Sequence, residues 1–130
     1  MIIDIFKLTG KHRRMEITCN IKNSTAIISI SANILGNPAD SKLFESQMKK
    51  LLDDGIDRTI MDLSDVKRIN STGLAILITG FNMMTECDGT FALANLNDFV
   101  VGALTITKLN NVFELYESVD DAFAEAKATN

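Results

Sequence analysis

The chain has 130 residues, of which 46% are hydrophobic and 23% are charged, and its net charge is -4 at pH 7. This size and composition predict one globular domain with a core that needs no disulfide or metal. The acidic balance argues against nucleic-acid binding, which depends on a basic face that neutralises phosphates. No secretory leader is recognised, and no apolar run approaches the roughly 20 residues that span a bilayer. We therefore expect a cytoplasmic protein without membrane insertion.

The first part of the chain predicts a short leader followed by a hairpin. Residues 1–14 are expected to be a leader or an additional edge strand, ahead of a domain at 15–130. Residues 16–22 alternate apolar and polar side chains, which is the period of a half-buried strand, and residues 25–31 are rich in β-branched residues. Two adjacent strands and an Asn-Ser turn predict an antiparallel pair.

A helix is expected next, because Asn37 suits an N-cap and Pro38 suits the first turn. Its apolar residues recur at helical spacing up to a glycine that suits a C-terminus, Gly55. Residues 58–63 then predict a short central strand, followed by a turn. Asn70-Ser71-Thr72-Gly73 begins a strongly apolar helix that is expected to end near Glu86.

The last part of the chain alternates strands and helices. We expect a strand at 90–94, a helix from about 98 to 107, a strand at 112–116 and a helix at 118–127 capped by Ser118. The third helix is expected to turn Val101, Leu104 and Ile106 inward. The order β-β-α-β-α-β-α-β-α predicts an α/β fold with a mixed, mostly parallel sheet of about five strands packed with four helices.

Ser71 is the most informative candidate site. Its hydroxyl is predicted to lie at the positive end of a helix dipole, beside free backbone N–H groups, and such a place tolerates a phosphate. Thr72 is the second possible acceptor. The residues alone favour a simpler interpretation, in which Asn70-Ser71-Thr72 only caps the helix and Gly73 permits close packing.

Two motifs in the correct order resemble a known family. Residues 61–74 (Met-Asp-Leu-Ser-Asp-Val-Lys-Arg-Ile-Asn-Ser-Thr-Gly-Leu) resemble the strand, turn and Asp-Ser-Ser/Thr-Gly-Leu helix start of the STAS domain. A second match comprises residues 94–97 (Ala-Asn-Leu-Asn) and 106–122, which are similar to that family's closing helix, strand and helix. The resemblance covers about residues 16 to 126. Within this family, the chain resembles the stand-alone bacterial anti-sigma factor antagonists.

The resemblance implies a partner switch controlled by phosphorylation. It implies that Ser71 is phosphorylated by a serine kinase that is also the anti-sigma factor, that the unphosphorylated form binds this partner, and that a serine phosphatase restores binding. The helix start and neighbouring loops are expected to bind the partner, through Asn37, Asn70, Ser71, Thr72, Leu74 and Ala75. The chain departs from the family at Asn70 and Asn37, which replace two acids, and this changes the charge beside the hydroxyl but not the capping.

Other functions remain open as alternatives. The same helix could serve a constitutive accessory subunit of a larger assembly, such as an ABC-type lipid transporter or a stressosome-like complex. A hydrolase using Ser71 lacks a nearby base, since the only histidine is His12 in the leader. Asp62 and Asp65 are more typical of caps or surface charges than of a metal pair. No catalytic residue, metal or cofactor is expected, and the oligomeric state is left open.

The two cysteines, Cys19 and Cys87, lie far apart in the sequence and have no metal-ligand spacing. We expect both to be buried or half-buried thiols of a reducing compartment.

Overall fold

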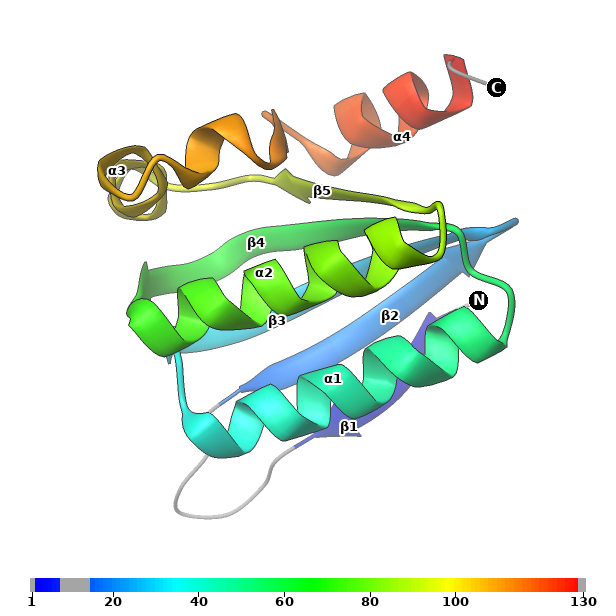
Figure 1. Cartoon of the computed structure of the whole chain (residues 1–130), viewed down its shortest axis with the longest axis horizontal. Helices are drawn as coiled ribbons and strands as arrows, with labels where there is room; N and C mark the ends of the chain where they lie inside the picture. The colour runs from blue at the N-terminus through cyan, green and yellow to red at the C-terminus, as the bar shows by residue number, and fades with distance from the viewer. Residues whose placement is uncertain (1, 8–14, 129–130) are drawn as a thin grey trace.

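The computed structural model describes residues 2–7 and 15–128, with side chains placed for residues 15–125. Its centre is one six-stranded sheet in which the strands lie in chain order, β1-β2-β3-β4-β5-β6 (Figure 1). The strands are β1 (Ile2–Lys7), β2 (Glu16–Lys22), β3 (Thr25–Leu35), β4 (Arg58–Ile69), β5 (Thr90–Ala94) and β6 (Glu114–Tyr116). The helices are α1 (Pro38–Asp53), α2 (Ser71–Glu86), α3 (Asp98–Ile106) and α4 (Val119–Ala128), with a 3-10 turn η1 (Leu109–Asn111) before β6.

The strand pairing confirms the predicted mixed, mostly parallel sheet with four helices. β1, β2 and β3 pair antiparallel, whereas β3, β4, β5 and β6 pair parallel. Each parallel pair is connected through a helix, as a parallel connection requires. The sheet has one strand more than the five expected, because residues 2–7 form its first edge. The division of the chain at residue 15 stays a prediction.

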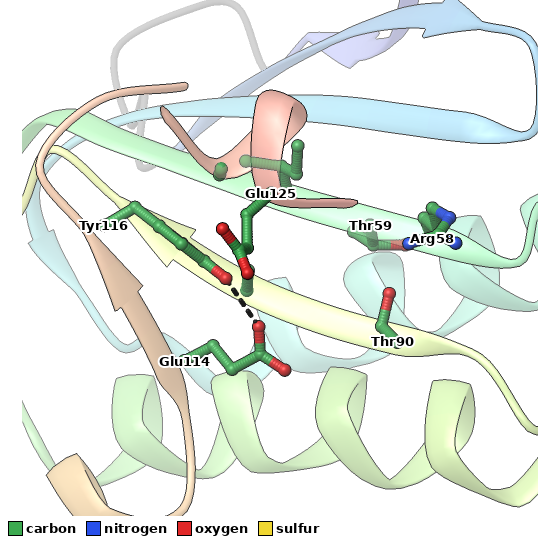
Figure 2. Close-up of a pocket in the computed structure, with 9 residues that line it drawn as sticks. Arg58, Thr59, Thr90, Glu114, Tyr116 and Glu125 are labelled. Carbon is green, nitrogen blue, oxygen red and sulfur yellow. Dashed lines mark hydrogen bonds between the residues drawn. The ribbon is translucent and has the colours of Figure 1, made fainter. Parts of the chain in front are cut away.

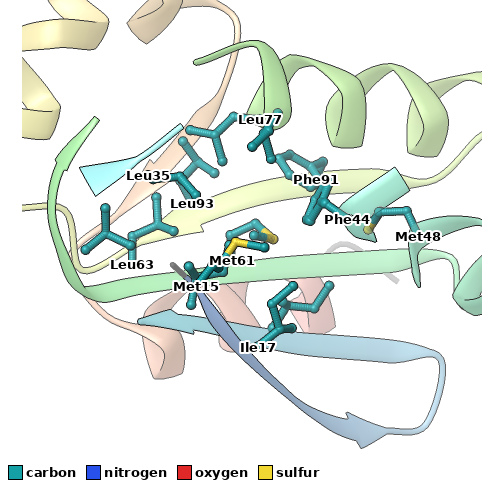
Figure 3. Close-up of a cluster of buried hydrophobic side chains, with 14 of the residues drawn as sticks. Met15, Ile17, Leu35, Phe44, Met48, Met61, Leu63, Leu77, Phe91 and Leu93 are labelled. Atoms are coloured by element: carbon teal, nitrogen blue, oxygen red, sulfur yellow. The ribbon is translucent and has the colours of Figure 1, made fainter. Parts of the chain in front are cut away.

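The two faces of the sheet are covered by different helices. α1 and α2 lie across one face (Figure 1), where alternate residues of β3 and β4 such as Ile28 and Met61 form the main core. Figure 3 shows that Phe44 and Met48 of α1 and Leu77 of α2 gather there with strand residues. On the opposite face, Ala122 of α4 packs in a smaller cluster on Ile27, Ile60 and Ala94.

Part of the opposite face is polar and open to water. Ser29 on β3 donates to Asp62 on β4 at 3.5 Å, and Ser31 donates to Asp65. These residues are paired in the strand register, and their hydroxyl–carboxylate pairs lie beside the apolar patch that α4 covers. This part of the sheet therefore presents hydroxyl groups bonded to carboxylates, outside the apolar cluster that α4 covers.

β4 is much longer than predicted. It was expected to end at Leu63 and turn, but it continues to Ile69 beside a β3 that continues to Leu35. An irregularity in the register between Asp62 and Asp65 interrupts the alternation of side chains. Leu63, Val66 and Ile69 are all buried at three-residue spacing, while the polar residues between them are exposed. The polar residues were misinterpreted as a turn for this reason.

The third helix is rotated from its expected orientation. Val100 and Leu104 are buried, whereas Val101 is exposed and Ile106 is 85% exposed. The four-residue spacing of Val100 and Leu104 places one narrow stripe inward, and Val101 and Ile106 fall outside it. The last strand also starts later than predicted, at Glu114, because η1 precedes it.

Candidate functional site

The amino ends of three helices lie at the same end of the sheet, beyond the carboxyl ends of its parallel strands. β3, β4 and β5 are parallel and each is followed by a helix, so the first turns of α1, α2 and α3 lie beyond their carboxyl ends. All three helices have asparagine as the N-cap, and each cap accepts a hydrogen bond from a first-turn amide. The bonds are Ala39 N to Asn37 Oδ1 at 2.9 Å, Gly73 N to Asn70 Oδ1 at 3.0 Å and Val100 N to Asn97 Oδ1 at 2.9 Å.

Ser71 is the first residue of α2, and its side chain is exposed. The amides of a helix's first turn have no acceptor within the helix, and the helix dipole gives this end a partial positive charge. The first turn of α2 contains no acidic residue. The hydroxyl therefore lies where an enzyme can reach it and where an added negative charge is favoured by the helix.

The side chains predicted to bind a partner form one surface around Ser71, which we call the Ser71 surface. It comprises Asn37, Asn70, Ser71, Thr72, Leu74 and Ala75. Asn70 and Ala75 are exposed, and Leu74 and Asn37 are half-buried. Ser71 and Ala75 share one helix face because they are four residues apart. The structure brings Asn37 to the same end of the sheet, and Asn70 contacts the residue that precedes it, Gly36.

The second possible acceptor, Thr72, is half-buried, so it is less accessible than its neighbour Ser71. Gly73 explains how α2 approaches the sheet so closely at this point. A Cβ atom at Gly73 would lie 2.1 Å from the carbonyl oxygen of Leu35 and 2.6 Å from a side-chain carbon of Ile69. The close packing predicted for this glycine is therefore present.

The capping role of Asn97 was not recognised from the sequence, although this residue fixes the neighbouring helix. Besides capping α3, its Nδ2 donates to the carbonyl oxygens of Val66 at 3.1 Å and Lys67 at 3.0 Å. These bonds attach the start of α3 to the extended end of β4. The available signal was an asparagine directly before Asp98 and an apolar run, which is typical of an N-cap.

The two aspartates that were considered as a metal pair have separate partners. Asp62 accepts hydrogen bonds from the Ser64 amide at 3.1 Å and from Asn95 Nδ2 at 3.0 Å. Asp65 accepts from Ser31. Among the residues that the structure describes, no group of three or more potential metal ligands is found. His12, named in connection with a hydrolase, lies outside the described residues.

A pocket of about 350 Å³ lies at the other end of the parallel strands, beside their first residues (Figure 2). Arg58, Thr90, Glu114, Tyr116 and Glu125 contribute side chains to it. The Tyr116 hydroxyl donates to Glu114 at 2.7 Å. Burial, and then the hydrogen bond and charge of Glu114 and the charge of Glu125, raise the pKa of Tyr116 to about 12. This pocket is separate from the Ser71 surface.

No helix in the described part of the chain is long and apolar enough to cross a lipid bilayer. The fold is thus a small α/β domain that exposes capped helix starts at one end of the sheet. The STAS domain model matches residues 14–122, which is most of the chain, and the protein belongs to the STAS domain family.

The chain is also similar to individual proteins. A Thermotoga maritima protein, assigned by its name to the anti-sigma factor antagonists, is 27% identical over 78 residues, covering 60% of this chain and 69% of the relative. The anti-sigma factor antagonist SpoIIAA in its unphosphorylated form has a TM-score of 0.74 at 10% identity, covering 86% of this chain and 96% of that chain. Its phosphorylated form, described as a Bacillus cell fate determinant, has a TM-score of 0.66. The STAS domain of a Vibrio cholerae SulP transporter has a TM-score of 0.65 at 16% identity, covering 85% of this chain and 86% of that chain.

Proposed function

We propose that this STAS domain is an anti-sigma factor antagonist whose partner binding is controlled by phosphorylation of Ser71. The unphosphorylated form binds an anti-sigma factor that is also a serine kinase, phosphorylation releases this partner, and a serine phosphatase restores binding. The chain itself catalyses no reaction in this scheme. The observation that carries the proposal is the exposed Ser71 hydroxyl at the first position of α2.

Two likenesses support this function over other roles of the fold. The Thermotoga maritima relative and SpoIIAA are both named as anti-sigma factor antagonists. The fold of this chain is similar to that of SpoIIAA in both its unphosphorylated and its phosphorylated form. A domain of this architecture therefore accommodates a phosphate. In this chain the place best suited to a phosphate by exposure and helix field is Ser71.

The physical effect of the phosphate is expected at the interface and not in the fold. A phosphoserine adds about -1.5 to -2 charges at neutral pH, and an exposed helix N-terminus stabilises such a charge by roughly 0.3–1 kcal/mol. Burying it without a partner charge at an interface costs several kcal/mol. Since about 1.4 kcal/mol is a tenfold change in affinity, one phosphate is sufficient to release a bound protein.

The test compares partner capture by the wild type, Ser71→Ala, Ser71→Asp and Thr72→Ala. Ser71→Ala and Thr72→Ala should retain a serine kinase partner from native cell extract, and Ser71→Asp should lose it with an unchanged circular dichroism spectrum. Mass spectrometry after incubation with that kinase and ATP should place the phosphate on Ser71. Kinase capture by Ser71→Asp, or a phosphate found on Thr72, would reject the proposed switch.

A second candidate is a constitutive accessory subunit, for example of an ABC-type lipid transporter or a stressosome-like complex. The observations that favour it are the amides of Asn37 and Asn70 in place of acids, and the likeness to a transporter's STAS domain. This function needs no phosphorylation. Equal recovery of transporter or complex components with Ser71→Ala, Ser71→Asp and the wild type would favour it over the switch.

A further inference from the structure

The side chain of Asn70 connects two loops that belong to different parts of the chain. Its Oδ1 accepts from the Gly73 amide at 3.0 Å, which is the cap of α2, while its Nδ2 donates to the carbonyl oxygen of Gly36 at 3.0 Å. Its backbone amide donates to the carbonyl oxygen of Leu35 at 3.2 Å. One residue thus ties the end of β3 and the loop before α1 to the first turn of α2.

Gly36 is shaped for this contact. Its φ of +145° is a backbone conformation that L side chains rarely adopt, and a Cβ atom there would lie 1.6 Å from Asn70 Oδ1. The carboxamide of Asn70 therefore occupies the space that a side chain at position 36 would fill. The residue after Gly36 is Asn37, so the contact fixes the start of the loop that carries one member of the Ser71 surface.

The contact requires an amide at position 70. Asparagine offers an acceptor and a donor at the end of one short side chain, whereas an ionised aspartate has only acceptors. An aspartate would keep the cap on Gly73 but would turn a carboxylate oxygen toward the Gly36 carbonyl oxygen. Serine would also keep a cap but is too short to reach Gly36 as well.

We propose that Asn70 is a positioning residue of the Ser71 surface, which holds the Asn37 loop against the start of α2 through its amide. The departure from the acid usual in this family is then a structural requirement of this chain, matched by Gly36. Asn37 is a natural contrast, because among the described residues its side chain makes only the capping bond to Ala39. The proposal builds on the proposed function only in its use of the Ser71 surface for partner binding.

Amide hydrogen exchange followed by NMR tests the contact in the isolated protein. In Asn70→Asp and Asn70→Ser, the amide of residue 70, which bonds to Leu35, and the amide of Asp40, which bonds to the Asn37 carbonyl oxygen, should exchange about tenfold faster. Asn37→Asp is the matched control, since it exchanges an amide for a carboxylate at a cap that uses only the acceptor. It should leave exchange at residue 70 unchanged.

A second control separates this local effect from general destabilisation. Asn97→Asp also removes an amide donor from a capping residue, but it should speed exchange at the start of α3 and leave residues 70 and 40 unchanged. Exchange at residues 70 and 40 that stays at the wild-type rate in both Asn70 variants would overturn the proposal. Faster amide exchange at residue 70 in Asn37→Asp would also overturn the proposal.

Kinetics with the partner kinase add a readout that loss of stability alone does not produce. For Asn70→Ser, checked as folded, the KM for phosphorylation of Ser71 should rise about tenfold while kcat stays within about twofold, because the loop moves but the hydroxyl stays on α2. An unchanged KM would overturn the role in positioning. If the wild type is not phosphorylated at all, the proposed switch fails, whereas the exchange data still decide the role of Asn70.

Discussion

Replacing Gly73 with alanine should destabilise the protein, although alanine is the better helix former. The added Cβ would lie 2.1 Å from the Leu35 carbonyl oxygen, so α2 and the end of β3 must separate by at least about 1.3 Å to reach an ordinary contact, which begins at 3.4 Å. Overpacking of this kind costs about 1–3 kcal/mol, and the intrinsic preference for alanine returns at most about 1 kcal/mol. Because the nearest atom belongs to the backbone and cannot move aside alone, we expect a cost of about 2–3 kcal/mol. The resulting net loss of about 1–2 kcal/mol corresponds to a fall in Tm of about 4–7 °C for a domain of this size.

Gly102 provides the control for this measurement, because it also lies within a helix but its Cβ would meet nothing within 4 Å. Gly102→Ala should raise the unfolding free energy by about 0.5–1 kcal/mol through the lower entropy of the unfolded chain. Both variants can be compared with the wild type by thermal denaturation followed by circular dichroism. Equal or greater stability of Gly73→Ala would refute the argument that α2 starts in close contact with β3.

Three further outcomes follow from other parts of the fold. Ser118→Ala should lower stability by about 0.5–2 kcal/mol in urea denaturation, because it removes the 3.0 Å cap bond at the start of α4. A thiol reagent should modify exposed Cys87 in the native protein and reach buried Cys19, whose pKa is raised to about 11 by burial, only on unfolding. Ultraviolet titration should show Tyr116 ionising near pH 12, and near a lower pH in Glu114→Gln. Because its folded pKa is raised, the stability linked to Tyr116 is complete below pH 10 and is lost as the pH rises toward 12.

Much of the architecture was predictable because local signals and burial agree. The alternating pattern gave β2 its observed bounds, and Asn37 with Pro38 and Asn70 with Ser71 located the starts of α1 and α2. At both helix starts the asparagine accepts a hydrogen bond from a first-turn amide that has no acceptor within the helix. Local chemistry and the final structure therefore indicate the same boundary.

The errors arose where tertiary structure overrides local pattern. The polar residues of the second half of β4 face solvent along an irregular register, which no periodicity of two or 3.6 would reveal. Cys87 was expected to be buried or half-buried, yet it is exposed, because α2 ends there and the residue becomes its C-cap. The inward stripe of α3 was assigned to Val101 and not Val100, since an apolar helix contains several equally good stripes.

The Ser71 surface was only partly visible in the sequence. The exposed serine and its cap follow from the order Asn70-Ser71-Thr72-Gly73, as the sequence predicted. The contact of Asn70 with Gly36 joins residues 34 positions apart, and it depends on the register that places Leu35 beside Ile69. Without a structure, nothing connects that glycine to that amide.

The partly covered face of the sheet has a consequence for handling the protein. Ile27 and Ile60 depend on α4 for cover, whereas Ser29 and Ser31 beside them are half-buried and already bonded to carboxylates. Fraying of α4 would therefore expose a small apolar patch surrounded by polar residues, and not the whole face of the sheet. Precipitation during purification should start from this apolar patch. Conditions that stabilise α4 should therefore suppress precipitation more effectively than added salt.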